Sequence, residues 1–352
     1  MSLTRFELVN LRCLERADLE LVPGCNLILG PNGAGKTSLL EGIYLLGRGR
    51  SFRTRHTERL IRRGASVLQV MGTQSPESPA QRIGFAFDVK GGPTARVDRR
   101  DVHSLADLAL AFPVQVIDPG IHRLVEEGPA FRRRWLDWGV FHVEHTFGGR
   151  WQQYSRGLKQ RNAALASGGD TAPWDADLIR HGEALALSRE AVVDQIRPEW
   201  DALISRLIQR PVQLGFHRGW SRERSLGEAF QASAARDRER GTTSVGPHRF
   251  DVALTVDGVP AREVLSRGQQ KLAGAGLVLV MARRVAQVAL VAPTLLVDDP
   301  AAELDGAHTA LVLAEVAALG GQLIVTALQP IPALMDLATR VFHVEQGAVQ
   351  QV

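Results

Sequence analysis

The chain has 352 residues, of which 45% are hydrophobic and 23% are charged, and its formal net charge is +4. This composition excludes a disordered or fibrous chain and provides length for about two globular domains. Its two cysteines, Cys13 and Cys25, are too few for a disulfide framework, so we expect a protein of the reducing cytoplasm.

Neither an export signal nor a membrane span is predicted. The first residues lack the basic-then-apolar layout of a signal peptide. The longest apolar stretch, residues 272–291, is interrupted by Arg283 and Arg284, so we expect no membrane partner. An isoelectric point of about 9.5 permits a nucleic-acid partner without requiring one.

The first part of the chain predicts β-structure. Alternating apolar and polar residues favour a hairpin of residues 4–14 and 17–21. Further strands are predicted over residues 67–73, 81–89, 95–97 and 114–117. Pro119 marks a change of pattern, and residues 121–240 are mostly helical. The predicted helices cover residues 129–145, 146–166 and 174–209, the last being one helix or two with a break at Pro198.

The chain then returns to alternating strands and helices, which implies a largely parallel sheet. The predicted strands are residues 251–256, 294–297, 322–326 and 341–345, and the helices are residues 266–291 and 305–319. We therefore expect an α/β fold with a discontinuous lobe, residues 1–118 and 245–352. An inserted, mainly α-helical lobe covers residues 119–244, and it lacks the sustained heptads of a long coiled coil.

A complete P-loop, GPNGAGKT, lies between the apolar run 26–29 and the helical pattern 38–46. Its glycines let the backbone fold around phosphates, Lys36 can reach the β- and γ-phosphates, and Thr37 can hold Mg²⁺. A glycine-rich turn before a helix is the weaker alternative, because every fixed element of the motif is present. The predicted ATP-binding residues are Gly30, Pro31, Asn32, Gly33, Ala34, Gly35, Lys36, Thr37 and Ser38.

Three further motifs follow in order: LSRGQQK (265–271), TLLVDD (294–299) and AELD (302–305). The second is an apolar strand that ends in Asp298, a carboxylate that can orient Mg²⁺ beside a P-loop. Each motif alone is weak evidence for an ATP site. SRGQQ could equally be an ordinary polar start of a helix, and LLVDD could be a buried strand that ends in a helix-capping acid. Their order and spacing favour one ATP site.

This arrangement resembles the ABC-type ATPases, including their DNA-repair and chromosome-maintenance branch. The resemblance implies that ATP is held between two subunits and that its hydrolysis separates them. The segment reaching the partner's γ-phosphate would be Ser266, Arg267, Gly268 and Gln269, and a loop linking the subunits would contain Glu303 and Asp305. Gln115 would connect Mg²⁺ to movement of the helical lobe, although a turn glutamine explains it nearly as well.

The remaining motifs are similar to those of the RecF family of bacterial DNA replication and repair proteins. They are LVNLR (8–12), residues 30–53, GPAFRRRWLDW (128–138), LKQRNAAL (158–165), SVGPHR (244–249) and LSRGQQK. The similarity runs end to end and places Arg12 at the ATP. It implies that ATP closes a homodimer on DNA at single-strand gaps or junctions. It also implies action with RecR and RecO in loading RecA.

Departures from the ABC pattern point to slow turnover. Asp299 stands where the catalytic glutamate is usual, Ala327 stands where a histidine is usual, and the third motif begins with Ala302 in place of serine. We expect a weak, DNA-stimulated ATPase that acts as a timer. A nucleotide-gated scaffold with little turnover remains an alternative. A transporter subunit is a weaker one, because the helical block is too long for that class.

Arginines provide candidate DNA contacts because guanidinium groups bind phosphates without sequence preference. The group chosen is Arg55, Arg59, Arg62 and Arg63. Other arginines could contact DNA or form ion pairs inside the fold; these are Arg132, Arg133, Arg134 and Arg161. The histidines show no metal-binding spacing, and His248 is better explained by packing or hydrogen bonding than by catalysis.

Overall fold

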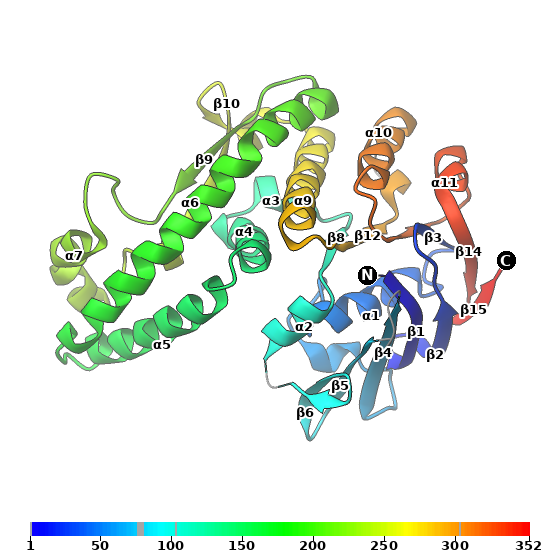
Figure 1. The fold of residues 1–352 in the computed structure, drawn as a ribbon, viewed down its shortest axis with the longest axis horizontal. Helices are drawn as coiled ribbons and strands as arrows, with labels where there is room; N and C mark the ends of the chain where they lie inside the picture. The colour runs from blue at the N-terminus through cyan, green and yellow to red at the C-terminus, as the bar shows by residue number, and fades with distance from the viewer. Residues whose placement is uncertain (1, 76–80, 103, 303) are drawn as a thin grey trace. The chain divides into compact units, whose positions relative to one another are not determined.

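The structure is a computed structural model that describes residues 2–75, 81–102, 104–302 and 304–352. It comprises two compact units (Figure 1). The first is formed by Met1–Ile121 together with Val285–Val352, and the second by His122–Arg284.

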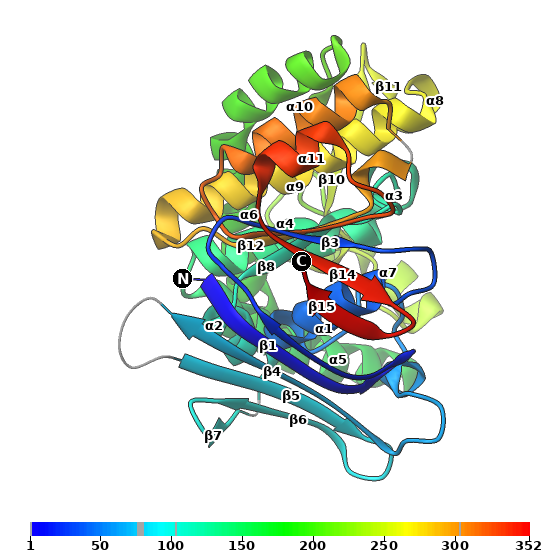
Figure 2. The same cartoon turned by 90° about the vertical axis from the view of Figure 1, so that its right-hand side faces the viewer.

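The N-terminal strands of the first unit form an antiparallel sheet in the order β2-β1-β4-β5-β6-β7 (Figure 2). The strands are β1 (Ser2–Leu11), β2 (Leu14–Glu20), β4 (Val67–Ser75), β5 (Gln81–Asp88), β6 (Gly92–Val97) and β7 (Arg100–Asp101). Burial alternates along β1 and β4, as expected for strands with one face on a core. The predicted N-terminal hairpin is confirmed, since Phe6 on β1 pairs with Leu19 on β2.

A second sheet of the first unit has the order β15-β14-β3-β13-β12-β8. Its strands are β3 (Cys25–Leu29), β8 (Val114–Ile117), β12 (Thr294–Asp298), β13 (Leu323–Ala327), β14 (Ala338–Glu345) and β15 (Ala348–Gln351). All neighbouring strands are parallel except β14 and β15. The carboxyl ends of β3, β12 and β13 therefore meet at one edge, which is where ligands bind in open α/β sheets.

Helix α1 (Lys36–Arg48) lies between these two sheets and is buried along most of its length. Its Leu39, Ile43 and Leu46 join Phe6 of the antiparallel sheet and Ile324 of the parallel sheet in one apolar core. This packing on both sides fixes the start of α1 beside the carboxyl end of β3. The other helices of the unit are η1 (Thr57–Leu60), α2 (Leu105–Ala111), η3 (Pro300–Ala302), α10 (Gly306–Ala317) and α11 (Pro332–Leu337).

The second unit is mainly helical. Its helices are α3 (Arg123–Glu126), α4 (Pro129–Val143), α5 (Phe147–Ala166), α6 (Ala172–Ile208), α7 (Leu226–Arg240), η2 (Pro247–Arg249), α8 (Ala261–Val264) and most of α9 (Arg267–Ala289). Helix α5 packs along α6, the longest helix in Figure 1. The one-helix alternative for this segment is confirmed, because α6 continues through Pro198. Ile196 and Trp200 are buried on either side of the proline, and their packing holds the helix together.

The second unit also contains a small antiparallel sheet, β11-β10-β9. Its strands are β9 (Gln213–His217), β10 (Asp251–Val256) and β11 (Val259–Pro260). Strand β10 was expected, whereas the helical prediction for residues 121–240 is wrong at β9. Leu214 and Phe216 of β9 are buried between more exposed neighbours, but five residues are too few for this alternation to distinguish a strand from the surrounding helical pattern.

The compact units and the expected lobes divide the chain differently on the C-terminal side. The second unit runs to Arg284 and so includes β10 and most of α9, which the sequence assigned to residues 245–352. Most of α9 belongs to the second unit because it packs against α4 there. For example, Trp135 Nε1 donates a hydrogen bond to the Leu277 carbonyl oxygen at 2.9 Å. The division into lobes of residues 1–118 with 245–352 and residues 119–244 stays a prediction about domain organisation.

Helix α9 is long and apolar enough to match a membrane span by composition. However, 67% of its most apolar stretch is buried within the structure. Gly139 of α4 approaches it so closely that an added Cβ would lie 1.9 Å from the Met281 sulfur. The burial and the close contact with α4 indicate that α9 is a core helix of the folded chain.

Several arginines of the second unit are structural. Arg132 is buried and forms a bidentate pair with Asp251, with nitrogen–oxygen distances of 2.8 and 2.9 Å. Arg161 is also buried, and it pairs with Asp175 and Asp237. The ion-pair alternative is therefore confirmed for Arg132 and Arg161, because a buried, paired guanidinium is not available to DNA phosphates.

His248 is held inside the second unit as a neutral ring. Its Nε2 lies 3.1 Å from the carbonyl oxygen of Thr243, which can only accept a hydrogen bond. Its Nδ1 therefore accepts from the Tyr154 hydroxyl at 2.8 Å. Burial lowers the pKa of His248 to about 4. The expected packing and hydrogen-bonding role agrees with these contacts.

We expect the free energy of unfolding to decrease between pH 6.5 and pH 4. The unfolded chain binds a proton at His248 in this range and the folded chain does not, so stability present above pH 6.5 is lost as the pH falls through the folded pKa of about 4. The loss should be at most about 3 kcal/mol. Denaturant titrations at pH 7 and pH 4.5 measure it, and His248→Gln should show a smaller loss. Equal losses in both proteins would assign the effect to other groups.

Candidate functional site

The P-loop connects β3 to α1 through residues with left-handed backbone conformations. Gly30 has φ +154° and Gly35 has φ +116°, and a Cβ at these positions would lie 2.2 Å from the Val344 carbonyl oxygen and 2.6 Å from Leu14 Cδ2. Only glycine fits both the torsions and the space. The start of α1 has neither a side-chain cap nor an acidic residue in its first turn, so its N–H groups remain free for an anion.

Lys36 supplies a buried positive charge at the loop. Its Nζ donates to the carbonyl oxygens of Gly30 at 2.7 Å and Pro31 at 3.1 Å. Desolvation lowers the pKa of Lys36, and the nearby Asp299 and Asp298 oppose that shift. The ammonium group is thus held by neutral carbonyls, which leaves its charge available to a phosphate.

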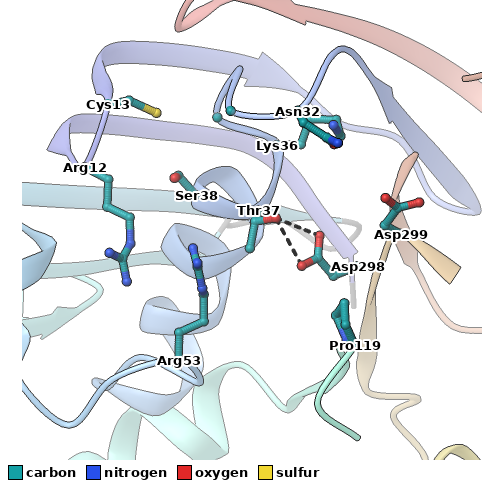
Figure 3. Close-up of a pocket in the computed structure, with 12 residues that line it drawn as sticks. Arg12, Cys13, Asn32, Lys36, Thr37, Ser38, Arg53, Pro119, Asp298 and Asp299 are labelled. Carbon is teal, nitrogen blue, oxygen red and sulfur yellow. Dashed lines mark hydrogen bonds between the residues drawn. The ribbon is translucent and has the colours of Figure 1, made fainter. Parts of the chain in front are cut away.

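Two acids from the end of β12 complete the site (Figure 3). The Thr37 hydroxyl lies 3.0 and 3.1 Å from the two carboxylate oxygens of Asp298. Asp299 follows with φ +46° and also lines the cleft. Desolvation raises the pKa of Asp299, Lys36 lowers it and Asp298 raises it. The sheet therefore brings together the P-loop and the two acids, which lie far apart in sequence.

A cleft of about 380 Å³ adjoins these groups, a volume within the usual range for small-molecule sites. It is lined by Arg12, Cys13, Asn32, Gly33, Gly35, Lys36, Thr37, Ser38, Arg53, Pro119, Asp298 and Asp299 (Figure 3). Of the predicted ATP-binding residues, Gly30, Pro31 and Ala34 shape the loop without lining the cleft.

Arg12 reaches the cleft from the turn between β1 and β2. Its Nε and Nη2 both donate to the carboxylate of Glu41, which is fully buried on α1. The Ser51 hydroxyl donates to the same carboxylate and accepts from the Arg53 backbone nitrogen at 2.9 Å. The hydrogen bonds from Arg12 to Glu41 raise the pKa of Arg12, so its charge is permanent and its position is fixed.

Three residues that line the cleft were not among the predicted site residues, namely Cys13, Arg53 and Pro119. Sequence distance does not show which of the arginines after the P-loop helix turns back toward the cleft, so Arg53 was not predicted to line it. Cys13 was considered only for disulfide bonding. The one feature of the sequence that could have indicated a cleft position for Cys13 is that it directly follows Arg12.

The oxygen ligands at the cleft fit Mg²⁺ if nucleotide phosphates and water complete its coordination. Thr37 and Asp298 would hold the ion, which would neutralise developing charge on the phosphates. In the part of the chain that the structure describes, no cluster of three or more His, Cys, Asp or Glu side chains could hold a metal without such help. Gln115 is not brought to this site, because it pairs with Leu295 at the start of β12, three positions before Asp298.

Comparison with known proteins agrees with this geometry. The family model described as RecF/RecN/SMC N terminal domain matches residues 2–350. The DNA replication and repair protein RecF of Shewanella baltica (strain OS185) is 38% identical over 99% of both chains. That of Shewanella sp. (strain W3-18-1) is 37% identical over the full length of both. The chain belongs to the RecF family.

Solved structures confirm the expected fold of this RecF-family chain. A structure of the recombination mediator protein RecF-ATP in the RecFOR pathway has a TM-score of 0.89 at 24% identity, covering 99% of this chain and 97% of that one. An Smc head domain from Pyrococcus furiosus, bound to the C-terminal domain of ScpA, has a TM-score of 0.60 at 13% identity. The fold is thus the α/β fold of the RecF and Smc ABC-type ATPase heads, with no long coiled coil in the described residues.

The segment predicted to reach a partner's nucleotide opens α9 in the second unit. The Ser266 backbone nitrogen donates to Gln269 Oε1 at 3.0 Å, and the Gln269 nitrogen donates to Ser266 Oγ at 3.3 Å. These reciprocal bonds form a capping box, and Ser266 is exposed. Arg267 donates to Glu126 at 2.6 Å. The structure shows an exposed, ordered helix start in this RecF-family chain, and the contact across subunits stays a prediction.

The predicted subunit-linking loop is only partly described. Glu303 lies outside the described residues. Asp305 caps α10, since its carboxylate accepts from the His308 backbone nitrogen at 2.9 Å and lies 2.7 Å from His308 Nδ1. Capping accounts for this aspartate locally, and its role between subunits stays a prediction.

The predicted DNA-contacting arginines occupy the segment around η1. Arg55, Arg59 and Arg63 are exposed, and no ion pair holds their side chains among the described residues. Arg62 differs, because its Nη2 lies 3.0 Å from Glu15. The first three are therefore the stronger candidates for phosphate contacts.

Proposed function

We propose that this RecF-family chain is an ATP-dependent DNA-binding protein of recombinational repair. The observation that carries the proposal is the meeting of Lys36, Asp298 and Asp299 at one cleft, in a chain similar to RecF proteins over its full length. An uncapped helix start and a buried ammonium favour a polyphosphate ligand, and a neighbouring carboxylate pair favours its hydrolysis.

In this proposal Lys36 and the P-loop backbone hold the phosphates, and Thr37 and Asp298 hold Mg²⁺. Asp299 orients the attacking water and accepts its proton. Desolvation raises the pKa of Asp299, which makes its carboxylate a stronger proton acceptor than a surface aspartate. Because Asp299 is one methylene shorter than glutamate and Ala327 provides no polar side chain, turnover is slow. DNA stimulates it by favouring the closed state.

ATP joins two copies of the chain. The Ser266–Gln269 segment of each copy contacts the nucleotide held by the other, so that ATP closes the dimer on DNA and hydrolysis releases it. The RecFOR name attached to the similar solved structures supports RecR and RecO as partners, with RecA loaded on gapped DNA as the outcome. The location is the cytoplasm. The full-length RecF match disfavours a transporter subunit.

A nucleotide-gated scaffold is the second candidate, and the Asp299 and Ala327 departures favour it. In that case ATP would close the dimer without measurable turnover. Single-turnover hydrolysis with and without DNA separates the two candidates, since only a DNA-stimulated timer accelerates when DNA is added.

Ser266→Arg should prevent ATP-dependent dimerisation, because a long cation at the exposed start of α9 would occupy the position of the partner's nucleotide. Sedimentation with and without ATP measures this. Ser221→Arg, at another exposed serine of the second unit, is the matched control and should still dimerise. A wild-type chain that remains a monomer in ATP would refute the shared-nucleotide arrangement.

DNA binding should be independent of sequence and strongly dependent on salt. Each phosphate contact contributes a log–log slope of about −0.9 on duplex DNA, so replacing Arg55, Arg59 and Arg63 with Gln should flatten the slope by up to about 2.7. ATP binding should persist, because none of the three lines the cleft. A control with equal charge loss replaces the exposed Lys90, Arg99 and Arg100. If only the control flattens the slope, the DNA surface lies elsewhere.

A further inference from the structure

We propose that Thr326 is a positioning residue for both acids of the cleft, acting through its hydroxyl group. Nothing in the motifs assigns it a role, and it lines no part of the cleft. The inference rests on the proposed ATPase function and deepens it. It names what holds Asp298 and Asp299 in place.

Thr326 lies on β13, directly opposite Asp298 in the parallel register with β12. Its side chain is fully buried. The hydroxyl oxygen lies 2.7 Å from Asp298 Oδ1 and 3.1 Å from the Asp299 backbone nitrogen. One side chain therefore contacts both acidic residues.

The direction of these hydrogen bonds follows from the groups involved. A backbone N–H can only donate, so the hydroxyl oxygen accepts from Asp299. The single hydroxyl proton is then free to be donated to the Asp298 carboxylate. Asp298 Oδ1 also lies 3.0 Å from the Thr37 hydroxyl. The carboxylate is thus fixed by hydroxyls from two elements, β13 and α1, before any nucleotide or ion is added.

The same residue fixes the backbone of Asp299. The Asp299 nitrogen divides its hydrogen bond between the Thr326 hydroxyl and the Thr326 carbonyl oxygen, each at 3.1 Å. The backbone of Asp299 is left-handed, with φ +46°, at the point where β12 ends. The aspartate side chain is one methylene shorter than that of glutamate, so its carboxylate can occupy fewer positions relative to the backbone. The placement of its backbone therefore determines where its carboxylate lies, and Thr326 determines that placement.

The test compares Thr326→Val, which keeps the shape of the side chain without the hydroxyl, with Thr326→Ser, which keeps the hydroxyl. Thr294→Val is the matched control, since Thr294 is also a buried threonine and lies at the opposite end of β12 from Asp298. Thr326→Val should lower kcat about 10- to 100-fold and raise the Mg²⁺ concentration needed for half-maximal ATP binding, as loss of a group that orients a ligand does. ATP affinity at saturating Mg²⁺ should change less than about 3-fold, because the P-loop is intact.

Thr326→Ser should recover most of the turnover, and Thr294→Val should match the wild type. Thermal unfolding checks that each variant is folded. Unchanged kcat and Mg²⁺ requirement in Thr326→Val would overturn the inference, as would equal losses in Thr326→Val and Thr326→Ser, which would indicate a steric role. A wild type without turnover would contradict the proposed ATPase instead, and the Mg²⁺ requirement for ATP binding would still decide the role of Thr326.

Discussion

Lys36→Ala should weaken ATP binding at least about 100-fold, since a hydrogen bond to a charged, desolvated group contributes roughly 3 kcal/mol. The lysine is buried, and its ammonium group contacts only loop carbonyls and neighbouring acids at long range. No other cation lies within the P-loop to replace it. Equilibrium titration with a fluorescent ATP analogue measures the loss.

Lys159→Ala, at an exposed lysine of α5, is the control and should bind ATP normally. Because Lys36 also donates to Gly30 and Pro31, the thermal unfolding of the variant must be measured without nucleotide. A folded Lys36→Ala protein with wild-type affinity for ATP would show that the P-loop is not the nucleotide site.

Asp299→Asn should keep ATP affinity and lose hydrolysis by about 10²- to 10⁴-fold, the range attributed to a general base. The amide has nearly the same shape as the carboxylate but cannot accept the proton of the attacking water. Single-turnover measurements with bound ATP separate this effect from binding. Asp299→Glu retains a carboxylate and should retain hydrolysis.

The pH dependence of turnover gives a second test of Asp299. Desolvation raises its pKa above the ordinary aspartate value of 3.8, so the base becomes protonated at a higher pH than a surface aspartate would. Hydrolysis should therefore decline as the pH falls through that raised pKa, and Asp299→Asn should lack this decline. If turnover is unchanged in Asp299→Asn, another group activates the water.

The parts of the site that sequence could predict are those set by local motifs and by strand order. The P-loop is one continuous segment, and a strand ending in Asp298 must meet it because parallel strands end at the same edge of a sheet. Thr326 and Arg53 could not be predicted in this way. Their positions depend on register between β12 and β13 and on the path of the chain after α1.

Other features of the fold depend on tertiary packing, which the local sequence pattern does not specify. Pro198 usually interrupts a helix, but buried neighbours on both sides keep α6 continuous. The resemblance to ABC-type ATPases implied that Gln115 contacts Mg²⁺, but in the structure Gln115 pairs with Leu295, three positions before Asp298 on β12. Its role at the metal stays a prediction. Sequence alone did not distinguish Arg132 and Arg161 from surface cations, whereas in the structure both guanidinium groups are buried and pair with Asp251 and Asp237.

The most direct test of an ATP-dependent DNA-binding function is the affinity for gapped duplex DNA with ATP, with ADP and without nucleotide. Measured for the wild type at one salt concentration, binding should be tightest with ATP and should weaken with ADP. It should also lose its ATP dependence in Lys36→Ala. Equal affinity of the wild type in all three nucleotide states, or tight binding to one particular sequence only, would contradict an ATP-dependent DNA-binding function.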